Sequence, residues 1–340
     1  GVILLNLCKE MEIEVLYSVH TRMFGETIFC RDQYETLPIY FGSSTDQDMQ
    51  KSREFLNTLN TKKIKAYESS ANNSAIIPIE LPNRWLRLFR DIKYRLGSEK
   101  MCIRESTYFV KLLIMFPKVH SFFIGMKFKI LQKRYFSALS DVKDTPDSFI
   151  YFPLQMTPES SINTLEPYFM DQEKLIDLIR LNMPDNFCLL VKEHPVMIGF
   201  RETGFYHRVS KKTGVTLIDS KVSGFELMTK AGLTVTITGT AALEAYLYNQ
   251  RAMVFGPTFF SHLSVKFDSY LGLGKIIRRA ISEKIDGSDH KKISDIAMLY
   301  NVSYPFILAD PISNPDVMGI ENIDMFLDSV KNHVGRLRND

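Results

Sequence analysis

The sequence predicts an α/β protein built around a parallel, doubly wound sheet. From Phe149 onward, short apolar runs alternate with helical stretches at a regular spacing. Alternation of this kind places the strands side by side and the helices on the faces of the sheet. Because the crossovers in such sheets are right-handed, the carboxyl ends of the strands meet at one edge, which is where ligands bind.

The elements of this second domain follow one another in order. Wholly apolar runs such as Leu189-Leu190-Val191 indicate central strands. The predicted strands span residues 149–154, 187–192, 215–218, 233–238 and 251–255. The predicted helices span residues 171–182, 203–212, 223–231 and 240–248, and two closing helices span 289–302 and 321–335.

The first part of the chain has an irregular α/β pattern. Residues 1–11 indicate a helix, 14–18 a strand, 19–26 a polar loop and 46–61 a polar helix. No strand precedes the opening helix, and such a helix lacks the partner that an α/β unit normally gives it. We therefore expect the first domain to be incomplete.

Composition limits the class of protein. The 340 residues suffice for two domains, and 45% hydrophobic with 12% aromatic residues exclude a disordered chain. The four cysteines are scattered and form no C-x-x-C pair, so we expect buried free thiols and a cytoplasmic protein. No run of 18 apolar residues predicts a transmembrane helix, and no basic segment indicates a signal peptide.

Positive charge is concentrated in residues 84–134. This segment has thirteen Lys or Arg against three Asp or Glu, although the whole chain carries only +3. Charges and apolar residues alternate there, which indicates amphipathic basic helices. Two interpretations stay open: helices whose basic stems lie on the protein surface, or contact with an anionic membrane surface or glycolipid, peripheral at the inner membrane. Nucleic acid is disfavoured because no binding module accompanies the charge.

The end of the second predicted strand carries Lys192-Glu193-His194-Pro195. Pro195 has no N–H and ends the strand ladder, which holds His194 at the rim of the sheet. An imidazole there can donate to a phosphate or a departing oxyanion, and Lys192 adds positive charge. The alternative is a histidine satisfied by a backbone carbonyl.

The fourth predicted strand runs into Thr238-Gly239-Thr240, and a helix carrying Glu244 follows. Gly239 permits a tight turn and close approach of a ligand. Thr240 is suited to the N-cap, and the N–H groups of a helix start favour a phosphate. Glu244 is placed to accept from ribose hydroxyls or to complete a capping arrangement, although any turn between a strand and a helix has a similar pattern.

A third polar segment, Gln155 to Ser161, follows the first predicted strand and belongs to the same edge. Glu159 is suited to be a base or to bind a sugar. The alternative is a proline-limited connecting loop. Asp219-Ser220 and Ser223 follow the third strand and reach the same edge.

These motifs together carry a family resemblance. Gln155-x-x-x-Glu159-Ser160, Lys192-Glu193-His194-Pro195 and Thr238-Gly239-Thr240-x-x-x-Glu244, in this order, resemble the capsule polysaccharide biosynthesis family. That family includes glycosyltransferases that add Kdo, an eight-carbon acidic sugar, to capsule lipid anchors. The segment Arg31 to Glu35 resembles its first domain. The resemblance covers residues 149–260 well and residues 5–40 loosely.

The resemblance implies a GT-B arrangement, in which two Rossmann-like domains face a cleft. The implied division is a partial N-terminal domain (1–83), a basic helical connection (84–146), a nucleotide-sugar-binding domain (147–283) and closing helices (284–340). It implies transfer of an acidic sugar from a CMP-activated donor to a cell-surface glycan or glycolipid. No Asp-x-Asp motif stands in a metal-binding setting, so we expect no metal and no cofactor besides the donor.

The resemblance also implies the site residues. His194, Lys192 and Glu159 would be catalytic. The donor set would be Gln155, Ser160, Glu193, Pro195, Ser223, Thr238, Gly239, Thr240 and Glu244. Two other readings stay open: a nucleotide-sugar epimerase or polyol-phosphate transferase of the same fold class, and a non-catalytic module that binds glycan or membrane.

Overall fold

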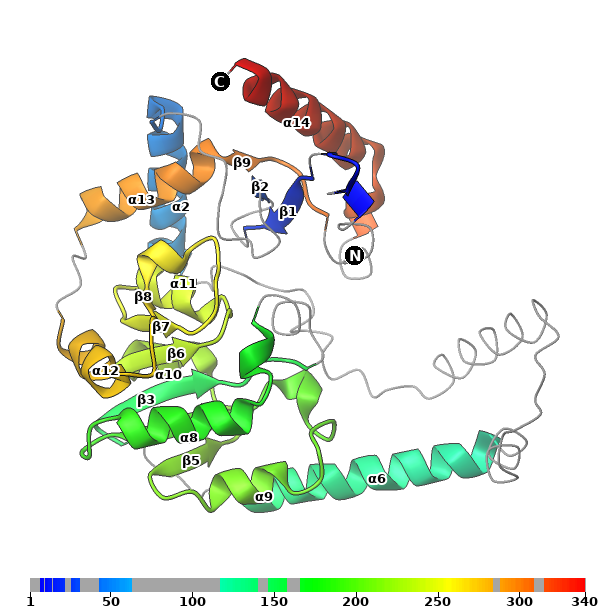
Figure 1. Ribbon diagram of the computed structural model, residues 1–340, viewed down its shortest axis with the longest axis vertical. Helices are drawn as coiled ribbons and strands as arrows, with labels where there is room; N and C mark the ends of the chain where they lie inside the picture. Colours follow the sequence, from blue (N-terminus) through cyan, green and yellow to red (C-terminus); the bar gives the residue numbers. More distant parts are fainter. Residues whose placement is uncertain are drawn as a thin grey trace.

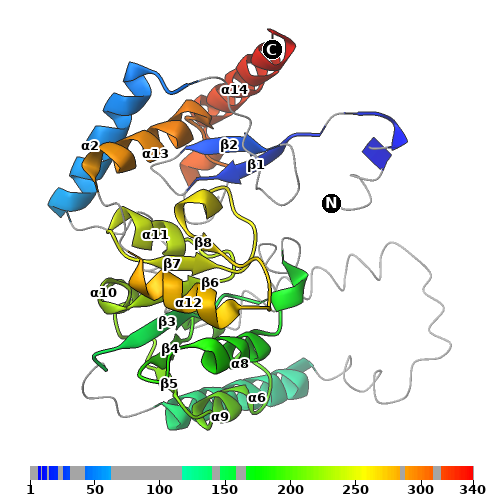
Figure 2. The ribbon, with the colours of Figure 1, turned by 60° about the vertical axis from the view of Figure 1, so that its left-hand side comes forward.

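The main body of the protein is a six-stranded parallel sheet. In the computed structural model the described residues are 7–8, 10–13, 15–21, 26–30, 43–62, 117–139, 146–157, 166–283, 288–308 and 315–339. The strands are β3 (Phe149–Pro153), β4 (Cys188–Lys192), β5 (Val215–Ile218), β6 (Leu233–Thr236), β7 (Ala252–Val254) and β8 (Val265–Lys266). Their order is β5-β4-β3-β6-β7-β8, and every pair is parallel (Figures 1 and 2). The predicted parallel α/β sheet is confirmed.

This order has a switch point between β3 and β6, where the chain direction across the sheet reverses. The strand built first lies in the middle, and later strands are added on either side of it. The connections that follow β3 and β6 therefore run in opposite directions across the sheet. In open α/β sheets, ligands bind outside the carboxyl edge at such a switch point.

Helices cover both faces because the strand residues are apolar on both sides. Ile150 and Phe152 face the core that is shared with α8 (Gln172–Asn182), α9 (Phe205–Ser210) and α12 (Leu273–Ser282). Phe149 and Tyr151 face the opposite core, with α10 (Gly224–Lys230) and α11 (Ala241–Leu247). The predicted helices of this domain are present, with α9 shorter than expected.

The first domain differs from the predicted Rossmann-like pattern in its described residues. β1 (Tyr17–His20) and β2 (Thr27–Cys30) form an antiparallel hairpin, and β9 (Ser303–Tyr304) pairs antiparallel with β2. The connection between His20 and Thr27 is too short for a crossover helix, so the two strands cannot be parallel neighbours. The predicted strand 14–18 starts later, at Tyr17, and most of the predicted helix 1–11 lies outside the described residues.

The C-terminal segment returns to this first domain. α13 (Asp289–Asn301) packs on α2 (Asp46–Lys62), where the Ser52 hydroxyl donates to the Ile293 carbonyl at 2.8 Å. α14 (Ile320–Asn339) lies beside β1, β2 and β9 (Figures 1 and 2). The predicted closing helices are therefore built into the structure that begins with β1, and one buried core joins this structure to α11.

The described part of the basic segment is one helix, α6 (Pro117–Ala138), which runs alongside α9 and extends beyond it (Figure 1). Leu131 and Tyr135 are buried against the main body, and Phe128 contacts Phe200 with ring centroids 5.1 Å apart. Lys127, Lys129, Lys133 and Arg134 are exposed. Residues 84–116 of the predicted basic segment lie outside the described residues.

The described residues bear on two expectations from composition, the one about membrane-spanning helices and the one about the cysteines. Within the described ranges, no helix is long and apolar enough to cross a membrane. Among the described residues, Cys8, Cys30 and Cys188 form no disulfide; Cys30 is buried and the other two are half-buried. Cys102 lies outside the described residues.

Candidate functional site

The loop after β3 meets the turn after β6 at the switch point. With its oxygen toward the turn, the Gln155 carboxamide accepts from the backbone N–H groups of Gly239 at 2.6 Å and Thr238 at 3.3 Å. With its nitrogen there, it donates to the Thr236 and Thr238 hydroxyls at 3.5 Å. Two N–H donors face this atom at short range, so the oxygen orientation satisfies more groups. Sequence reasoning placed Gln155 and this turn on one edge, and the structure brings them into contact.

Gly239 is required by close packing rather than by its backbone angle. Its φ is not among the positive values, so an L-residue can adopt its conformation. A Cβ atom at this position would lie 2.6 Å from Thr236 Oγ1 and 2.8 Å from Gln155 Nε2. The Gly239 N–H also donates to Thr236 Oγ1 at 3.1 Å. The groups that approach Gly239 closely are therefore side chains of the protein itself, Thr236 and Gln155, whereas the sequence predicted the close approach of a ligand.

Thr240 occupies the N-cap position of α11, as predicted, but its side chain makes no capping hydrogen bond. α11 has only seven residues, so its dipole is a small source of positive potential. Any anion at this turn must therefore rely mainly on individual N–H and hydroxyl donors.

His194 stands where β4 ends and the short 3₁₀ helix Pro195–Met197 begins. Its Nδ1 accepts a hydrogen bond from the Val196 N–H at 3.3 Å. Burial lowers the pKa of the imidazole, partly opposed by the charge of Glu193 and reinforced by those of Lys192 and Arg201. A neutral ring that accepts at Nδ1 carries its proton on Nε2, which makes Nε2 a hydrogen-bond donor. This contact differs from the alternative in which a backbone carbonyl satisfies the ring.

Glu193 is buried and forms a bidentate ion pair with Arg201. Arg201 Nε lies 2.8 Å from one carboxylate oxygen and Nη2 lies 3.0 Å from the other. The carboxylate also accepts from the His194 N–H at 2.7 Å and from the Tyr206 hydroxyl at 3.1 Å. These four hydrogen bonds use both carboxylate oxygens, so Glu193 holds the loop that carries His194 in place.

Arg201 was not predicted, and it links the loops after β3 and β4. Its Nη2 donates to the Gln155 carbonyl at 2.7 Å, and its Nη1 donates to the Thr157 hydroxyl at 3.1 Å. The Gln172 carboxamide holds the Gln155 backbone from another side, accepting at 2.8 Å and donating at 3.1 Å. One signal in the sequence pointed to Arg201: Glu193 follows a wholly apolar strand, and a carboxylate buried there needs a cation.

The remaining predicted residues that the structure describes lie on or next to α11, α10 and β4. Glu244 lies in the first turn of α11 near Tyr151, whose phenol pKa is raised by burial and then by the Glu244 charge. Ser223 caps α10 by accepting from the Glu226 N–H at 3.3 Å. Lys192 is the half-buried last residue of β4. Glu159 and Ser160 lie outside the described residues.

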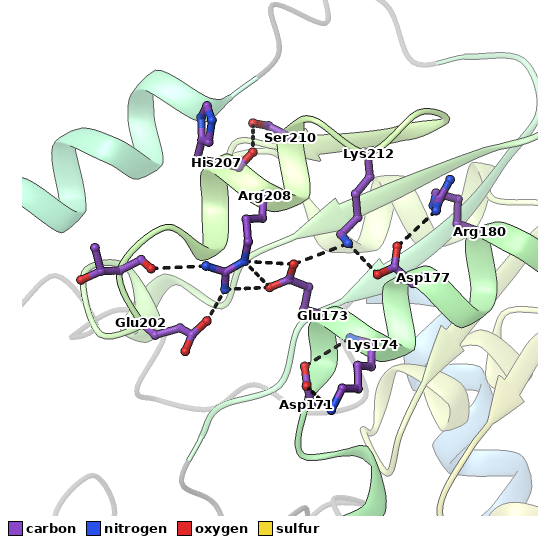
Figure 3. A network of polar contacts seen from close by, with 11 residues as sticks. Asp171, Glu173, Lys174, Asp177, Arg180, Glu202, His207, Arg208, Ser210 and Lys212 are labelled. Atoms are coloured by element: carbon purple, nitrogen blue, oxygen red, sulfur yellow. Dashed lines mark hydrogen bonds and ion pairs between the residues drawn. The ribbon is translucent and has the colours of Figure 1, made fainter.

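A second polar network lies on the surface of α8 and α9. Figure 3 shows Arg208 between the carboxylates of Glu173 and Glu202, and Lys212 between Glu173 and Asp177. A groove of about 560 Å³ lies beside it, with Arg201 in its wall. Among the residues that the structure describes, no three acidic, His or Cys side chains are grouped to hold a metal ion.

Comparisons with known proteins place these observations in context. Residues 118–291 match the family described as capsule polysaccharide biosynthesis protein. None of the curated proteins compared with the chain matches it.

Several solved structures are similar at a low level. The β-Kdo 2,4 transferase of Thermosulfurimonas dismutans KpsC is 12% identical, with 86% of this chain and 82% of that chain covered and a TM-score of 0.43. The β-Kdo 2,7 transferase of the same KpsC is 15% identical, with 56% and 67% covered and a TM-score of 0.31. The UDP-GlcNAc 2-epimerase of Methanocaldococcus jannaschii is 14% identical, with 51% and 48% covered and a TM-score of 0.34. These scores are too low to establish a shared fold.

Proposed function

Because the chain belongs to the capsule polysaccharide biosynthesis protein family, we propose that it is a glycosyltransferase that moves Kdo from a CMP donor to a capsule or other cell-surface glycan or glycolipid. The observation that carries this proposal is the convergence of the Gln155 loop, the His194 loop and the Thr238–Thr240 turn at the switch point. A GT-B arrangement, with a second domain across a cleft, is part of the proposal.

His194 is the central catalytic residue of this proposal. When the bond between the sugar and the phosphate oxygen breaks, negative charge increases on the departing CMP. The neutral imidazole, with Nδ1 accepting from Val196, presents Nε2–H as the donor to that phosphate. Lys192 adds positive charge beside it, and Pro195 holds His194 at the strand end. Fixed donors of this kind replace the metal ion that other transferases use.

The turn after β6 binds the donor phosphate in this proposal. Thr238, Gly239 and Thr240 provide backbone N–H and hydroxyl donors. The Gln155 carboxamide covers two of those N–H groups in the free protein, so a phosphate that uses them takes the place of its oxygen. Gln155 then turns its amide toward the transferred sugar.

Other residues complete the proposed site. Glu244 accepts from the ribose, and Glu159 and Ser160 face the transferred sugar. Ser223 uses its oxygen to cap α10, so it contributes its hydroxyl proton as a donor to the ligand. Glu193 acts by holding the His194 loop in place.

The exposed face of α6 supports a peripheral contact with an anionic membrane surface. Lys129, Lys133 and Arg134 are exposed beside Ile130 and Phe136, which are 45% and 51% exposed. Basic side chains next to exposed apolar ones are typical of surfaces that bind anionic lipid. Such a contact would hold the enzyme near a lipid-linked acceptor.

Nucleotide release tests the proposed function. The protein is incubated with CMP-Kdo or with UDP-sugars, with and without a glycolipid acceptor, and the freed nucleotide is measured. We expect release of CMP that depends on the acceptor and falls by at least about 100-fold in His194→Ala. His207→Ala is the matched control, because His207 is exposed on α9.

Other outcomes of this experiment would contradict the proposal in different ways. Turnover of a UDP-sugar alone would remove the CMP donor. A changed sugar nucleotide without acceptor would indicate an epimerase. Binding of glycan without binding of any nucleotide would indicate a non-catalytic module.

A further inference from the structure

We propose that Arg201 is a positioning residue that fixes the His194 loop relative to the Gln155 loop, and through Gln155 relative to the Thr238–Gly239 turn. This inference rests on the proposed function for the identity of the ligand. The Arg201 side chain is only 6% exposed, and the side chain of Glu193, its ion-pair partner, is 0% exposed. The Glu193 side chain is fully buried and cannot contact a donor, and Arg201 shows only a small part of its side chain to the groove beside α8. We therefore place the effect of both residues on donor binding in the loops that they hold.

The guanidinium group uses both sides of its fork. On one side, Nε and Nη2 donate to the Glu193 carboxylate in the loop after β4, at 2.8 and 3.0 Å. On the other side, Nη2 donates to the Gln155 carbonyl at 2.7 Å and Nη1 donates to the Thr157 hydroxyl at 3.1 Å, both in the loop after β3. The planar fork fixes the angle between the two sets of contacts, which a lysine ammonium cannot do.

Each end of this bridge continues to a predicted ligand-binding group. The Glu193 carboxylate accepts from the backbone N–H of His194 at 2.7 Å, so the pair holds the backbone that carries the imidazole. The Gln155 side chain contacts the N–H groups of Thr238 and Gly239. An unbroken series of contacts therefore joins the three strand ends.

The chemistry favours a geometric role over a purely stabilising one. A buried ion pair gives little net stability, because the loss of hydration offsets most of its attraction. Arg208 makes comparable pairs with Glu173 and Glu202 on the protein surface. Its polar contacts, with Glu173 in α8 and with Glu202 and Thr203 just before α9, reach none of the three strand ends.

The test compares Arg201→Lys and Tyr206→Phe with the wild type, and uses Arg208→Lys as the matched control. Tyr206→Phe keeps the ring and removes one hydrogen bond to Glu193. Circular dichroism checks the fold of each variant. Calorimetry measures CMP affinity, and ¹⁵N NMR measures the tautomer and pKa of the His194 imidazole in the free protein.

For Arg201→Lys we expect retained secondary structure, a fall in CMP affinity of about tenfold or more, and a mixture of His194 tautomers in place of the Nε2–H form. Tyr206→Phe should shift both readouts less, and Arg208→Lys should shift neither. Equal CMP affinity and an unchanged His194 spectrum in folded Arg201→Lys and Tyr206→Phe would overturn the inference. If the wild type binds no CMP, the proposed donor fails, while the His194 spectra still decide whether Arg201 positions the loop.

Discussion

Gly239→Ala should disrupt the turn after β6 through one added methyl group. The new Cβ would lie 2.6 Å from Thr236 Oγ1 and 2.8 Å from Gln155 Nε2, where ordinary contact begins at 3.4 Å. The hydroxyl and the amide must therefore retreat by about 0.8 and 0.6 Å. Thr236 is fully buried in β6 and has little freedom to move, so most of the displacement falls on Gln155.

The cost can be estimated from these contacts. Overpacking of this kind destabilises by about 1–3 kcal/mol, which includes the weakening of one or two hydrogen bonds at about 1 kcal/mol each. Because the added methyl group also stands beside the N–H groups that the phosphate uses in the proposed function, we expect a fall in CMP affinity of roughly tenfold or more, equivalent to about 1.4 kcal/mol. Urea unfolding followed by circular dichroism measures the first effect, and calorimetry with CMP measures the second.

Gly335→Ala is the matched control for this change. A Cβ at Gly335 in α14 would meet nothing within 4 Å, and alanine in a helix is favoured over glycine by about 1 kcal/mol. We expect this variant to be as stable as the wild type or more so, with the same CMP affinity. Wild-type stability and affinity in Gly239→Ala would show that the turn has room for a methyl group at this position.

Three further predictions concern charge. Burial lowers the pKa of the His194 imidazole in the folded protein below its usual value of 6.5, so the unfolded chain binds a proton at His194 more readily. The contribution of His194 to stability is therefore complete above pH 6.5 and is lost as the pH falls from 6.5 toward the lowered pKa. In that pH range the free energy of unfolding of His194→Gln should vary less with pH than that of the wild type. Curves of unfolding free energy against pH that run parallel in the two proteins would contradict this. Arg201→Met should destabilise by about 3–5 kcal/mol because it leaves a buried carboxylate unpaired; a stability equal to that of wild type would show that Glu193 does not need its partner. Replacing Lys129 and Lys133 by Gln should weaken binding to phosphatidylserine vesicles by about 2 kcal/mol, or roughly 30-fold, and unchanged sedimentation with vesicles would remove α6 from the membrane contact.

The parallel sheet was predictable because its strands are buried on both faces. Runs such as Leu189-Leu190-Val191 are apolar throughout, and the structure places β3, β4, β5 and β6 within two residues of the predicted ends. β8 has only two residues, Val265 and Lys266, and carries no such signal. α12 was also missed, since it follows an aromatic-rich loop rather than one of the predicted strands.

The first domain and the buried support of the site depend on contacts between distant parts of the chain. β2 pairs with β9 across more than 270 residues, and no local pattern specifies that partner. Arg201 is likewise unremarkable in its own segment, because its meaning comes from Glu193, Gln155 and Thr157 after folding. Sequence motifs identified the polar groups at the rim, whereas the groups that hold them required the structure.

A crystal structure of the protein with CMP would show whether the donor phosphate binds at the switch point between β3 and β6. We predict that the phosphate lies within hydrogen-bond distance of His194 Nε2 and of the Thr238–Thr240 turn, with the Gln155 carboxamide moved away from the Gly239 N–H. CMP bound at another edge of the sheet, or at this edge without contact to His194, would rule out the proposed donor site.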